Sequence, residues 1–572
     1  MRLRGPDASG EWFDGEAGVC LGHRRLAIID LDARANQPFV SSDGRYVTVY
    51  NGEIYNYREL GAELEAGGVR LRTTSDTEVA LELFRRDGAA AFPKLRGMFA
   101  LVIWDTEQRT LTLARDPNGI KPLYLASTPS GVLFASQVKA LLDSGLVSRS
   151  VDPAGAVGFY IWGSVPEPFT AYEQIQAVPA GAVSTVKGGR VETVRFADIA
   201  SAWADAESAP DDLAAVVRAA LEDTVRAHLV SDVPVGVLLS GGVDSGVVAG
   251  LMAEFGQAVE GVTIAFEEFA GGGRDEVPRA RDIARAYGLK HTIRPVNKAE
   301  FLADAPRILD AMDQPSIDGV NTWFGAKAIA ERGYKVALSG IGGDEIFCGY
   351  DTFRRAPQLH RAGRAIALAG PLRALAAPAF AAAARLARQP KLAALPRHAG
   401  TLDGAYMLWR ALLTPGELNG LLPKEMVRDG LERLELAGPS RGRAQEAGAR
   451  QIAALESRRY LRNQLLRDSD WASMAHSLEL RTPLVDWTLQ RSLGGYATSF
   501  LEGRGKRLMA QAPRTPLPAS VTEHRKTGFG LPIGDWLAEA GLMPAHVPPQ
   551  MQAPWARGWA CAVAESFGFP RP

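Results

Sequence analysis

The chain has 572 residues, a length at which roughly two to four domains are expected. Lysine and arginine total 64 and aspartate and glutamate total 65, so the formal net charge is −1. This balance excludes a strongly basic nucleic-acid-coating protein and an acidic tail protein. Hydrophobic residues make up 46% of the chain and charged residues 23%, which is typical of a folded globular protein.

The three cysteines, Cys20, Cys348 and Cys561, form neither a CxxC pair nor a cysteine–histidine ladder. Their spacing predicts neither a disulfide framework nor a structural zinc site, and it fits a reducing cytoplasm. The first residues lack the apolar segment of a signal peptide, and the longest apolar candidate, 153–166, is too short to span a membrane. We therefore expect a cytoplasmic protein without membrane or nucleic-acid partners.

Residues 1–190 are predicted to form a β-rich domain. Short apolar or alternating runs, which are typical of strands, occupy 19–23, 46–50, 98–104 and 110–114. The last two runs flank a short polar turn, which predicts a hairpin. Helices are predicted over 57–66, with Asn56 as its N-cap, and over 75–87, where Ser75 begins an acidic first turn.

A polar stretch at 201–212 indicates a linker, placed at 191–212, before a second domain over 213–540. From there strands and helices alternate, which favours a doubly wound parallel sheet. Strands are expected at 235–239, 259–266, 291–294 and 335–338, and helices at 212–229, 246–255, 277–287, 299–312 and 321–332. After residue 350 the chain is helical and basic, which we interpret as a solvated helical face rather than a docking surface. Residues 541–572 form a C-terminal tail without a recognisable pattern.

The motif with the clearest chemistry is Ser-Gly-Gly-Val-Asp-Ser at 240–245. It lies between an apolar strand and a helix, where backbone N–H groups and the positive end of the helix can bind phosphate. Asp244 would repel a bare phosphate, so its presence indicates Mg²⁺ between the carboxylate and the phosphate. A glycine-rich turn without function is the alternative, and the completeness of the motif argues against it.

A second loop, Ser-Gly-Ile-Gly-Gly-Asp at 339–344, also follows a predicted strand. Ligands of doubly wound sheets bind at the carboxyl ends of the strands. Both loops are expected at that edge, so we predict that Asp244 and Asp344 hold the same metal ion.

The two loops belong to a longer ordered series of motifs. The others lie at 474–486 and 524–532 and, in the N-terminal part, at 4–7, 23–26, 50–56, 74–78 and 115–124. From residue 4 to about 537 the series resembles the glutamine-hydrolysing asparagine synthetases. The resemblance implies an α/β protein with an αββα Ntn-hydrolase-like class II glutamine amidotransferase domain, lacking its first strand. It also implies a doubly wound parallel-sheet ATP-pyrophosphatase domain with added helices.

The resemblance implies a two-step chemistry in the second domain. A carboxylate attacks the α-phosphorus of ATP to give an acyl-adenylate and pyrophosphate, and ammonia then displaces AMP to leave an amide. Such a step needs charge neutralisation above all. Lys526, before Gly-Phe-Gly, matches the catalytic lysine, and Mg²⁺ would be held by Asp244 and Asp344. The implied ATP-binding residues are Leu239, Ser240, Gly241, Gly242, Asp244, Ser245, Ile264, Ser339 and Gly340.

In the first domain the implied glutamine-binding residues are Arg25, Asn51, Gly52, Glu53 and Asp76. Arg25 would pair with the α-carboxylate of glutamine, because its planar guanidinium suits bidentate pairing. Glu53 and Asp76 would bind the α-ammonium group, and the Asn51 side chain and the Gly52 N–H would form an oxyanion hole. The implied partners are small molecules: ATP, glutamine or ammonia, and aspartate or another carboxylate. A homodimer is left open.

The sequence departs from the family pattern at the nucleophile, a cysteine at the mature N-terminus whose own amine serves as base. No such residue opens this sequence, and Cys20, within an apolar run, is expected to be a buried thiol. Because every predicted glutamine-binding residue is present, a start assigned too far downstream is favoured over lost glutaminase activity. As written, the chain is expected to use ammonium salts rather than glutamine.

A second departure is Ile341, where asparagine synthetases usually carry an acidic residue. Isoleucine cannot accept a proton or orient ammonia. Aspartate remains the first candidate for the acceptor, and the alternative is another carboxylate, as in relatives from natural-product or polysaccharide pathways. From other classes, a silent nucleotide-binding protein and a tRNA-modifying pyrophosphatase are disfavoured by the complete loops and the neutral charge.

Overall fold

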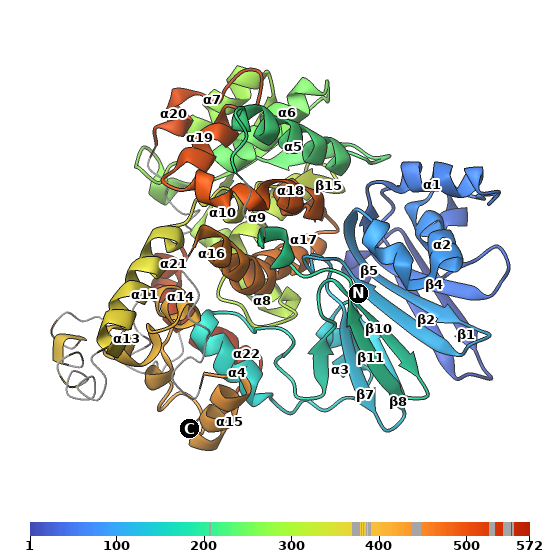
Figure 1. Ribbon diagram of the computed structural model, residues 1–572, viewed down its shortest axis with the longest axis horizontal. Coiled ribbons are helices and arrows are strands. Elements are labelled where there is room, and N and C mark those ends of the chain that lie inside the picture. Colours follow the sequence, from blue (N-terminus) through green and yellow to red (C-terminus); the bar gives the residue numbers. More distant parts are fainter. Residues whose placement is uncertain are drawn as a thin grey trace.

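The computed structural model describes residues 1–204, 208–368, 391–436, 448–524, 532–540, 551 and 554–571, with a few single positions between 378 and 386. The chain forms two β-containing halves with a helical region beside them (Figure 1).

The first half is built on a six-stranded antiparallel sheet in the order β11-β10-β6-β5-β4-β3. The strands are β3 (Phe39–Val40), β4 (Tyr46–Ile54), β5 (Gly97–Asp105), β6 (Thr110–Arg115), β10 (Ala182–Lys187) and β11 (Arg190–Arg195). The predicted hairpin is confirmed, since β5 and β6 pair from Asp105 opposite Thr110 onward. Pairing of β11 with β10 carries this sheet to residue 195, inside the segment that we predicted to be a linker.

Helices and small sheets cover the two faces of this sheet. One face packs against α1 (Tyr57–Ala66) and α2 (Asp76–Asp87). The other packs against β1 (Ala8–Asp14) and β2 (Val19–Arg25), and against the sheet of β7 (Tyr124–Thr128), β8 (Gly131–Ala135) and β9 (Ile175–Ala177). Helix α3 (Val138–Asp143) lies beside β8. The layers are helix, sheet, sheet and helix, as the αββα prediction required.

Two local predictions in this half are wrong. The Asn56 side chain does not cap α1, because its amide donates to the Lys94 carbonyl and its oxygen accepts from the Arg96 N–H. Cys20 is exposed rather than buried. Successive side chains of a strand point to opposite faces, and in β2 it is the neighbouring Leu21 that faces the core. Ser75 does cap α2, by accepting from the Thr77 N–H at 3.2 Å.

The second half contains the predicted parallel sheet, in the order β14-β13-β12-β15-β16. Its strands are β12 (Val235–Leu238), β13 (Glu260–Phe266), β14 (Lys290–Val296), β15 (Val336–Leu338) and β16 (Glu479–Arg481). Its helices are α5 (Leu213–His228), α6 (Val243–Glu254) and α7 (Val277–Tyr287) on one face, and α8 (Lys298–Ala311) and α9 (Val320–Ala330) on the other. This arrangement confirms a doubly wound sheet.

The remaining α-helices and one π-helix form the region beside the sheet, except that those between residues 487 and 522 pack on the layer of α5, α6 and α7 (Figure 1). They are α4 (Pro153–Trp162), α10 (Gly343–Ile346), α11 (Thr352–Leu368), α13 (Lys391–His398), α14 (Leu402–Arg410), α15 (Lys424–Arg433), α16 (Ala449–Glu456), the π-helix η8 (Ser457–Leu466), α17 (Arg467–Met474), α18 (Trp487–Leu493), α19 (Arg504–Ala510), α20 (Ala519–Thr522), α21 (Ile533–Ala540) and α22 (Trp555–Ser566). Within the described ranges, no helix combines the length and the apolar character that a bilayer crossing needs.

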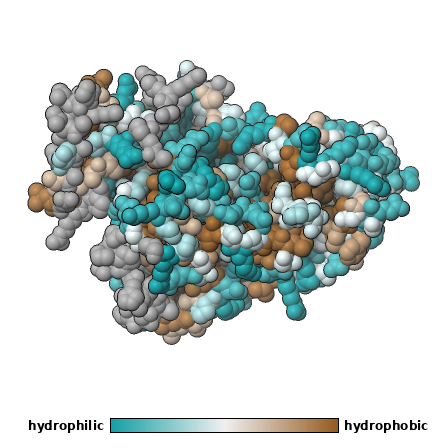
Figure 2. Space-filling view, turned by 90° about the horizontal axis from the view of Figure 1, so that it is seen from below, coloured by the Kyte–Doolittle hydropathy of each residue, from teal (hydrophilic) through white to brown (hydrophobic). Residues whose placement is uncertain are grey.

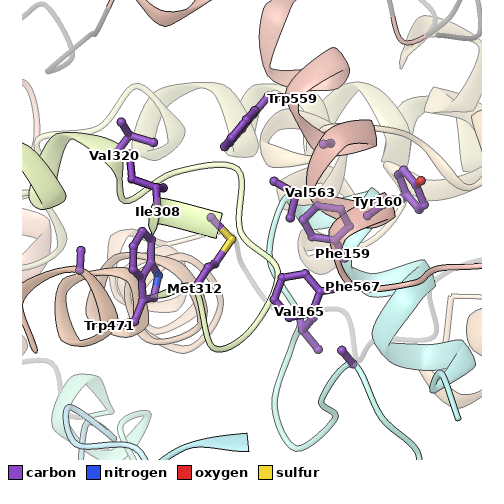
Figure 3. Close-up of a cluster of buried hydrophobic side chains, with 14 of the residues drawn as sticks. Phe159, Tyr160, Val165, Ile308, Met312, Val320, Trp471, Trp559, Val563 and Phe567 are labelled. Atoms are coloured by element: carbon purple, nitrogen blue, oxygen red, sulfur yellow. The ribbon is translucent and has the colours of Figure 1, made fainter. Parts of the chain in front are cut away.

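Helix α22 lies in the segment that we predicted to be a tail without a pattern. Trp559 and Val563 lie four residues apart on its apolar face, and Phe567 follows four residues later. Figure 3 shows Val563 and Phe567 beside Phe159 of α4, in a cluster that also contains Val320. The segment after residue 554 is therefore part of the central core. Hydrophilic side chains dominate the outer face shown in Figure 2, with separate hydrophobic areas between them.

Candidate functional site

The two Ser-Gly loops meet at the carboxyl edge of the parallel sheet. Strands β12 and β15 are neighbours, with Val237 paired to Leu338, so their following loops begin side by side. A Cβ atom added at Gly340 would lie 2.6 Å from the Ser245 backbone nitrogen. The loops therefore touch through their backbones, and only glycine allows this approach.

Lys506, from α19, joins the carboxylates of the two loops. Its Nζ forms a short ion pair with Asp244 and lies 2.8 Å from Oδ1 of Asp344. Burial lowers the pKa of Lys506, but the two carboxylates outweigh burial and hold that pKa above its usual range. Sequence analysis missed this residue, because an isolated lysine in a helix carries no local motif.

These groups line a cavity of about 1090 Å³, called here the ATP cavity after the ligand that the sequence analysis predicts for these loops. The predicted residues in its lining are Ser240, Gly241, Gly242, Asp244 and Asp344. The other five predicted ATP-binding residues are not part of this lining. Leu239, Ser245, Ile264 and Ser339 are buried, and Gly340 lies in the contact between the loops. Lys526 lies outside the described residues.

Asp244 and Asp344 can be compared with the ligand sets that metal ions use in proteins. Among the described residues, no group of three or more histidine, cysteine, aspartate or glutamate side chains could hold a metal ion. Mg²⁺ in nucleotide sites commonly takes one or two carboxylates and completes its octahedron with water and substrate phosphates. Asp244 and Asp344, which face one cavity and converge on one cation, fit that smaller set.

Ile341 lies between the two halves rather than in a polar pocket. Its half-buried side chain packs on a small apolar cluster that contains Leu461 and Val485, beside Ile120 of the first half. The position at which the family resemblance led us to expect an acid therefore has an apolar side chain that packs on other apolar side chains.

The first half contains a second cavity, of about 360 Å³, called here the glutamine cavity. Its lining includes every predicted glutamine-binding residue: Arg25, Asn51, Gly52, Glu53 and Asp76. A Cβ atom added at Gly52 would lie 2.0 Å from the Met98 carbonyl oxygen of β5, so this position requires glycine. The structure brings together residues that lie 51 positions apart in the sequence.

Two of these side chains are already engaged. The Arg25 guanidinium donates to the carbonyls of Ile29 and Asp32 at 3.1 and 3.0 Å, and so holds the loop after β2. Asp76 accepts at 3.0 Å from both the Tyr50 hydroxyl and the Ile54 N–H. Burial nevertheless raises the pKa of Asp76 to about 6, because these hydrogen bonds only partly stabilise the charge. Their roles toward glutamine stay predictions.

Glu53 connects the glutamine cavity to the parallel sheet. Its Oε2 lies 3.7 Å from Nη2 of Arg481, which enters from β16. Arg481 is fully buried, and its Nε donates to Glu479 at 2.8 Å. Burial raises the pKa of Glu53 well above its usual range, Glu479 and Asp76 add to this, and Arg481 opposes it. Sequence analysis did not single out Arg481.

Family comparisons divide the chain in the same way. Residues 1–197 match the glutamine amidotransferase domain model, and residues 216–550, more than half of the chain, match the asparagine synthase model. The chain belongs to the asparagine synthase family. It is thus a carbon–nitrogen ligase of the asparagine synthetase type, and asparagine synthetases use ATP.

Three relatives illustrate the range of this family. Glutamine-hydrolyzing asparagine synthetase 1 of Bacillus subtilis is 32% identical over 542 residues, which cover 93% of this chain and 83% of that protein. A putative glutamine-hydrolyzing asparagine synthetase of Mycobacterium tuberculosis is 33% identical, with coverage of 95% and 84%. Amidase chry2 of Gibberella zeae is 32% identical over 375 residues, which cover 61% of this chain and 54% of that protein.

The contact between the loops of this asparagine synthase family member can be tested with Gly340→Ala. The added methyl group would push Gly340 away from the Asp244–Ser245 backbone, and a misplacement of about 1 Å can lower a rate roughly 100-fold. We expect a loss of that order in ATP-dependent pyrophosphate release, with a small change in Tm. Gly400→Ala is the control, because a Cβ atom there meets nothing within 4 Å. Equal rates in the two variants would show that the contact is dispensable.

Proposed function

We propose that the protein forms an amide from a carboxylate and ammonia in an ATP-dependent reaction. The carboxylate attacks the α-phosphorus of ATP to give an acyl-adenylate and pyrophosphate, and ammonia then displaces AMP. The observation that carries this proposal is the convergence of Asp244, Asp344 and Lys506 on one cavity at the carboxyl edge of the parallel sheet. Family membership supports the same chemistry.

The residues of the ATP cavity have distinct tasks in this proposal. The Ser240–Gly242 loop precedes the twelve-residue helix α6, whose N-terminal N–H groups and dipole favour phosphate. Lys506 places a positive charge where pyrophosphate would leave, and the predicted Lys526 would add a second one. When bound to Asp244 and Asp344, Mg²⁺ would neutralise phosphate charge.

Aspartate is the first candidate for the acceptor, because relatives at 32–33% identity are named asparagine synthetases. Another carboxylate is the second candidate. It is favoured by Ile341, which cannot itself act as an acid or base and packs on the apolar side chains of Leu461 and Val485. A relative that covers part of this chain is named an amidase rather than an asparagine synthetase.

We also propose that the glutamine cavity binds glutamine through Arg25, Glu53 and Asp76, with Asn51 and Gly52 around the reacting amide. No cysteine is among the described residues that line this cavity. Ammonium salts are therefore the nitrogen source with which we expect this 572-residue chain to work.

ATP–pyrophosphate exchange tests the proposal most directly. Exchange should require a carboxylate substrate, and the later addition of ammonium should release AMP and the amide. Glutamine should not replace ammonium above background. If ATP is cleaved to ADP, or if no carboxylate stimulates exchange, the proposed reaction is wrong.

A further inference from the structure

A third cavity, of about 480 Å³, lies on the other side of Tyr350 from the ATP cavity; we call it the Arg459 cavity. Tyr350 lines the ATP cavity, and its hydroxyl donates to Glu345 at 3.0 Å, one residue from Asp344. The Arg410 guanidinium lies 4.5 Å from the Tyr350 ring centre, and Arg410 lines the Arg459 cavity. The two cavities thus share one thin wall of side chains.

A rare helix type forms part of this cavity. The π-helix η8 contributes Arg459, Tyr460 and Gln464 to the lining. Hydrogen bonds in a π-helix join residues five apart, so Arg459 and Gln464 share a face. Segments of this kind are uncommon and occur frequently at functional sites. The π-helical geometry of η8 presents these side chains to one space.

The charged side chains in the cavity wall are mainly cationic: Lys391, Arg410, Arg459 and Arg557 stand against one carboxylate in the described lining. Arg410 and Arg557 are paired with Glu456 at 2.8 Å and Glu417 at 3.0 Å. The two other cations, Arg459 and Lys391, have no carboxylate partner among the residues that the structure describes. Arg459 lies over the Trp162 ring at 5.5 Å, and Lys391 donates to the Trp409 carbonyl.

The pKa of Lys391 reflects this excess of positive charge. The pKa is lowered to about 8, first by burial and then by the neighbouring Arg557, while Glu417 opposes the shift. An anion placed beside Lys391 would favour the charged ammonium form and so oppose the lowering of its pKa by burial and by Arg557.

Two further polar groups point to a ligand with hydrogen-bonding groups. The half-buried Asp318 is the carboxylate in the lining, and its Oδ1 accepts from the Gly319 N–H at 2.9 Å. The indole N–H of Trp162 is buried and, within the described part of the chain, has no hydrogen-bond partner. A buried donor without a partner is unfavourable, and a bound acceptor oxygen would satisfy it.

We propose that the Arg459 cavity binds the acceptor, and that the acceptor is an acid larger than aspartate with a second anionic group, held by Arg459 and Lys391. This inference rests on the proposed ATP-dependent amide formation, and among its two candidate acceptors it selects another carboxylate over aspartate. The reacting carboxylate would reach the ATP cavity past Arg410 and Tyr350, while the second anionic group stays at Arg459. Asp318 binds a hydroxyl or ammonium group of the same molecule. A volume of about 480 Å³ is in the range that holds ligands larger than a four-carbon amino acid.

The test is ATP–pyrophosphate exchange with acids of increasing length: aspartate, glutamate, 2-aminoadipate and 2-aminopimelate, each beside its analogue without the second anionic group. A second arm uses phosphorylated acids, which separates a carboxylate from a phosphate as the second group. We expect exchange to improve beyond four carbons and to need the second anionic group.

Arg459→Gln should raise KM for the preferred acid at least about tenfold, and Arg459→Lys should restore part of the loss. KM for ATP should stay within about twofold in both variants, since Arg459 does not line the ATP cavity. Arg355→Gln is the matched control, because Arg355 lies over the Trp409 ring at 5.8 Å but outside both cavities.

The outcomes separate the two proposals. If exchange is fastest with aspartate, or if Arg459→Gln leaves KM for the acid unchanged, the inference of a larger acceptor is wrong. The proposed amide formation would be unaffected. Stimulation by no acid of either series, in a protein that still binds ATP, would overturn both.

Discussion

Replacing Asp344 by asparagine should abolish most pyrophosphate release. The substitution keeps the size of the side chain but removes one of the two negative charges that converge on Lys506, and one of the two oxygen ligands available to Mg²⁺. Losing a preorganised charged group at a phosphate site costs about 100-fold or more in rate. The measurement is pyrophosphate release under saturating ATP, with circular dichroism and Tm to show that the fold is intact.

Asp351→Asn provides the control for this prediction. Asp351 lines the same cavity but is exposed, and its ion pair among the described residues is with Arg354 at 3.3 Å. Exposed ion pairs of this kind contribute little. We expect near-normal release from it. If Asp344→Asn also kept a near-normal rate, the assignment of the phosphate and metal site to these loops would be wrong.

Arg481→Met should destabilise the protein by about 3–5 kcal/mol, because it leaves the buried Glu479 and Glu53 without their common cation. The variant also loses the hydrogen bonds that Arg481 donates to the carbonyls of His228 and Val230. Urea denaturation followed by tryptophan fluorescence measures the change in the free energy of unfolding.

An exposed pair gives the comparison. Arg34 and Asp32 have side chains that are 72% and 47% exposed, so Arg34→Met should leave the free energy of unfolding nearly unchanged. The double variant Arg481→Met with Glu53→Gln should be less unstable than the sum of the single changes, since both remove charge from one cluster. Strict additivity would refute the coupling between the glutamine cavity and the sheet.

Local sequence patterns were sufficient to predict most strands of the parallel sheet, but few of the side-chain contacts around it. Strands such as β13 and helices such as α7 follow from apolar runs and helical periodicity, which burial in a doubly wound sheet enforces. The loops of the ATP cavity followed from glycine and aspartate at strand ends. The cap at Asn56 failed because two backbone groups near residue 95 compete for the same side chain.

The contacts that sequence analysis did not predict join residues that lie far apart in the sequence. Lys506 lies 262 positions from Asp244, and no motif connects them. The Arg459 cavity is assembled from α4, α14, η8 and α22, and none of these segments shows its role alone. A π-helix cannot be read from periodicity, since its hydrogen bonds differ from those of an α-helix only by one residue.

The position of α22 also affects how the chain can fold during its synthesis. Phe569, just after this helix, packs edge-on against Phe159 of α4 at 5.9 Å (Figure 3 shows the cluster around Phe159). At ribosomal rates of about 5–20 residues per second, roughly 20–80 s separate the synthesis of these two rings. Throughout that interval the apolar face of α4 lacks its final cover, so the nascent chain must stay unaggregated until its last helix emerges.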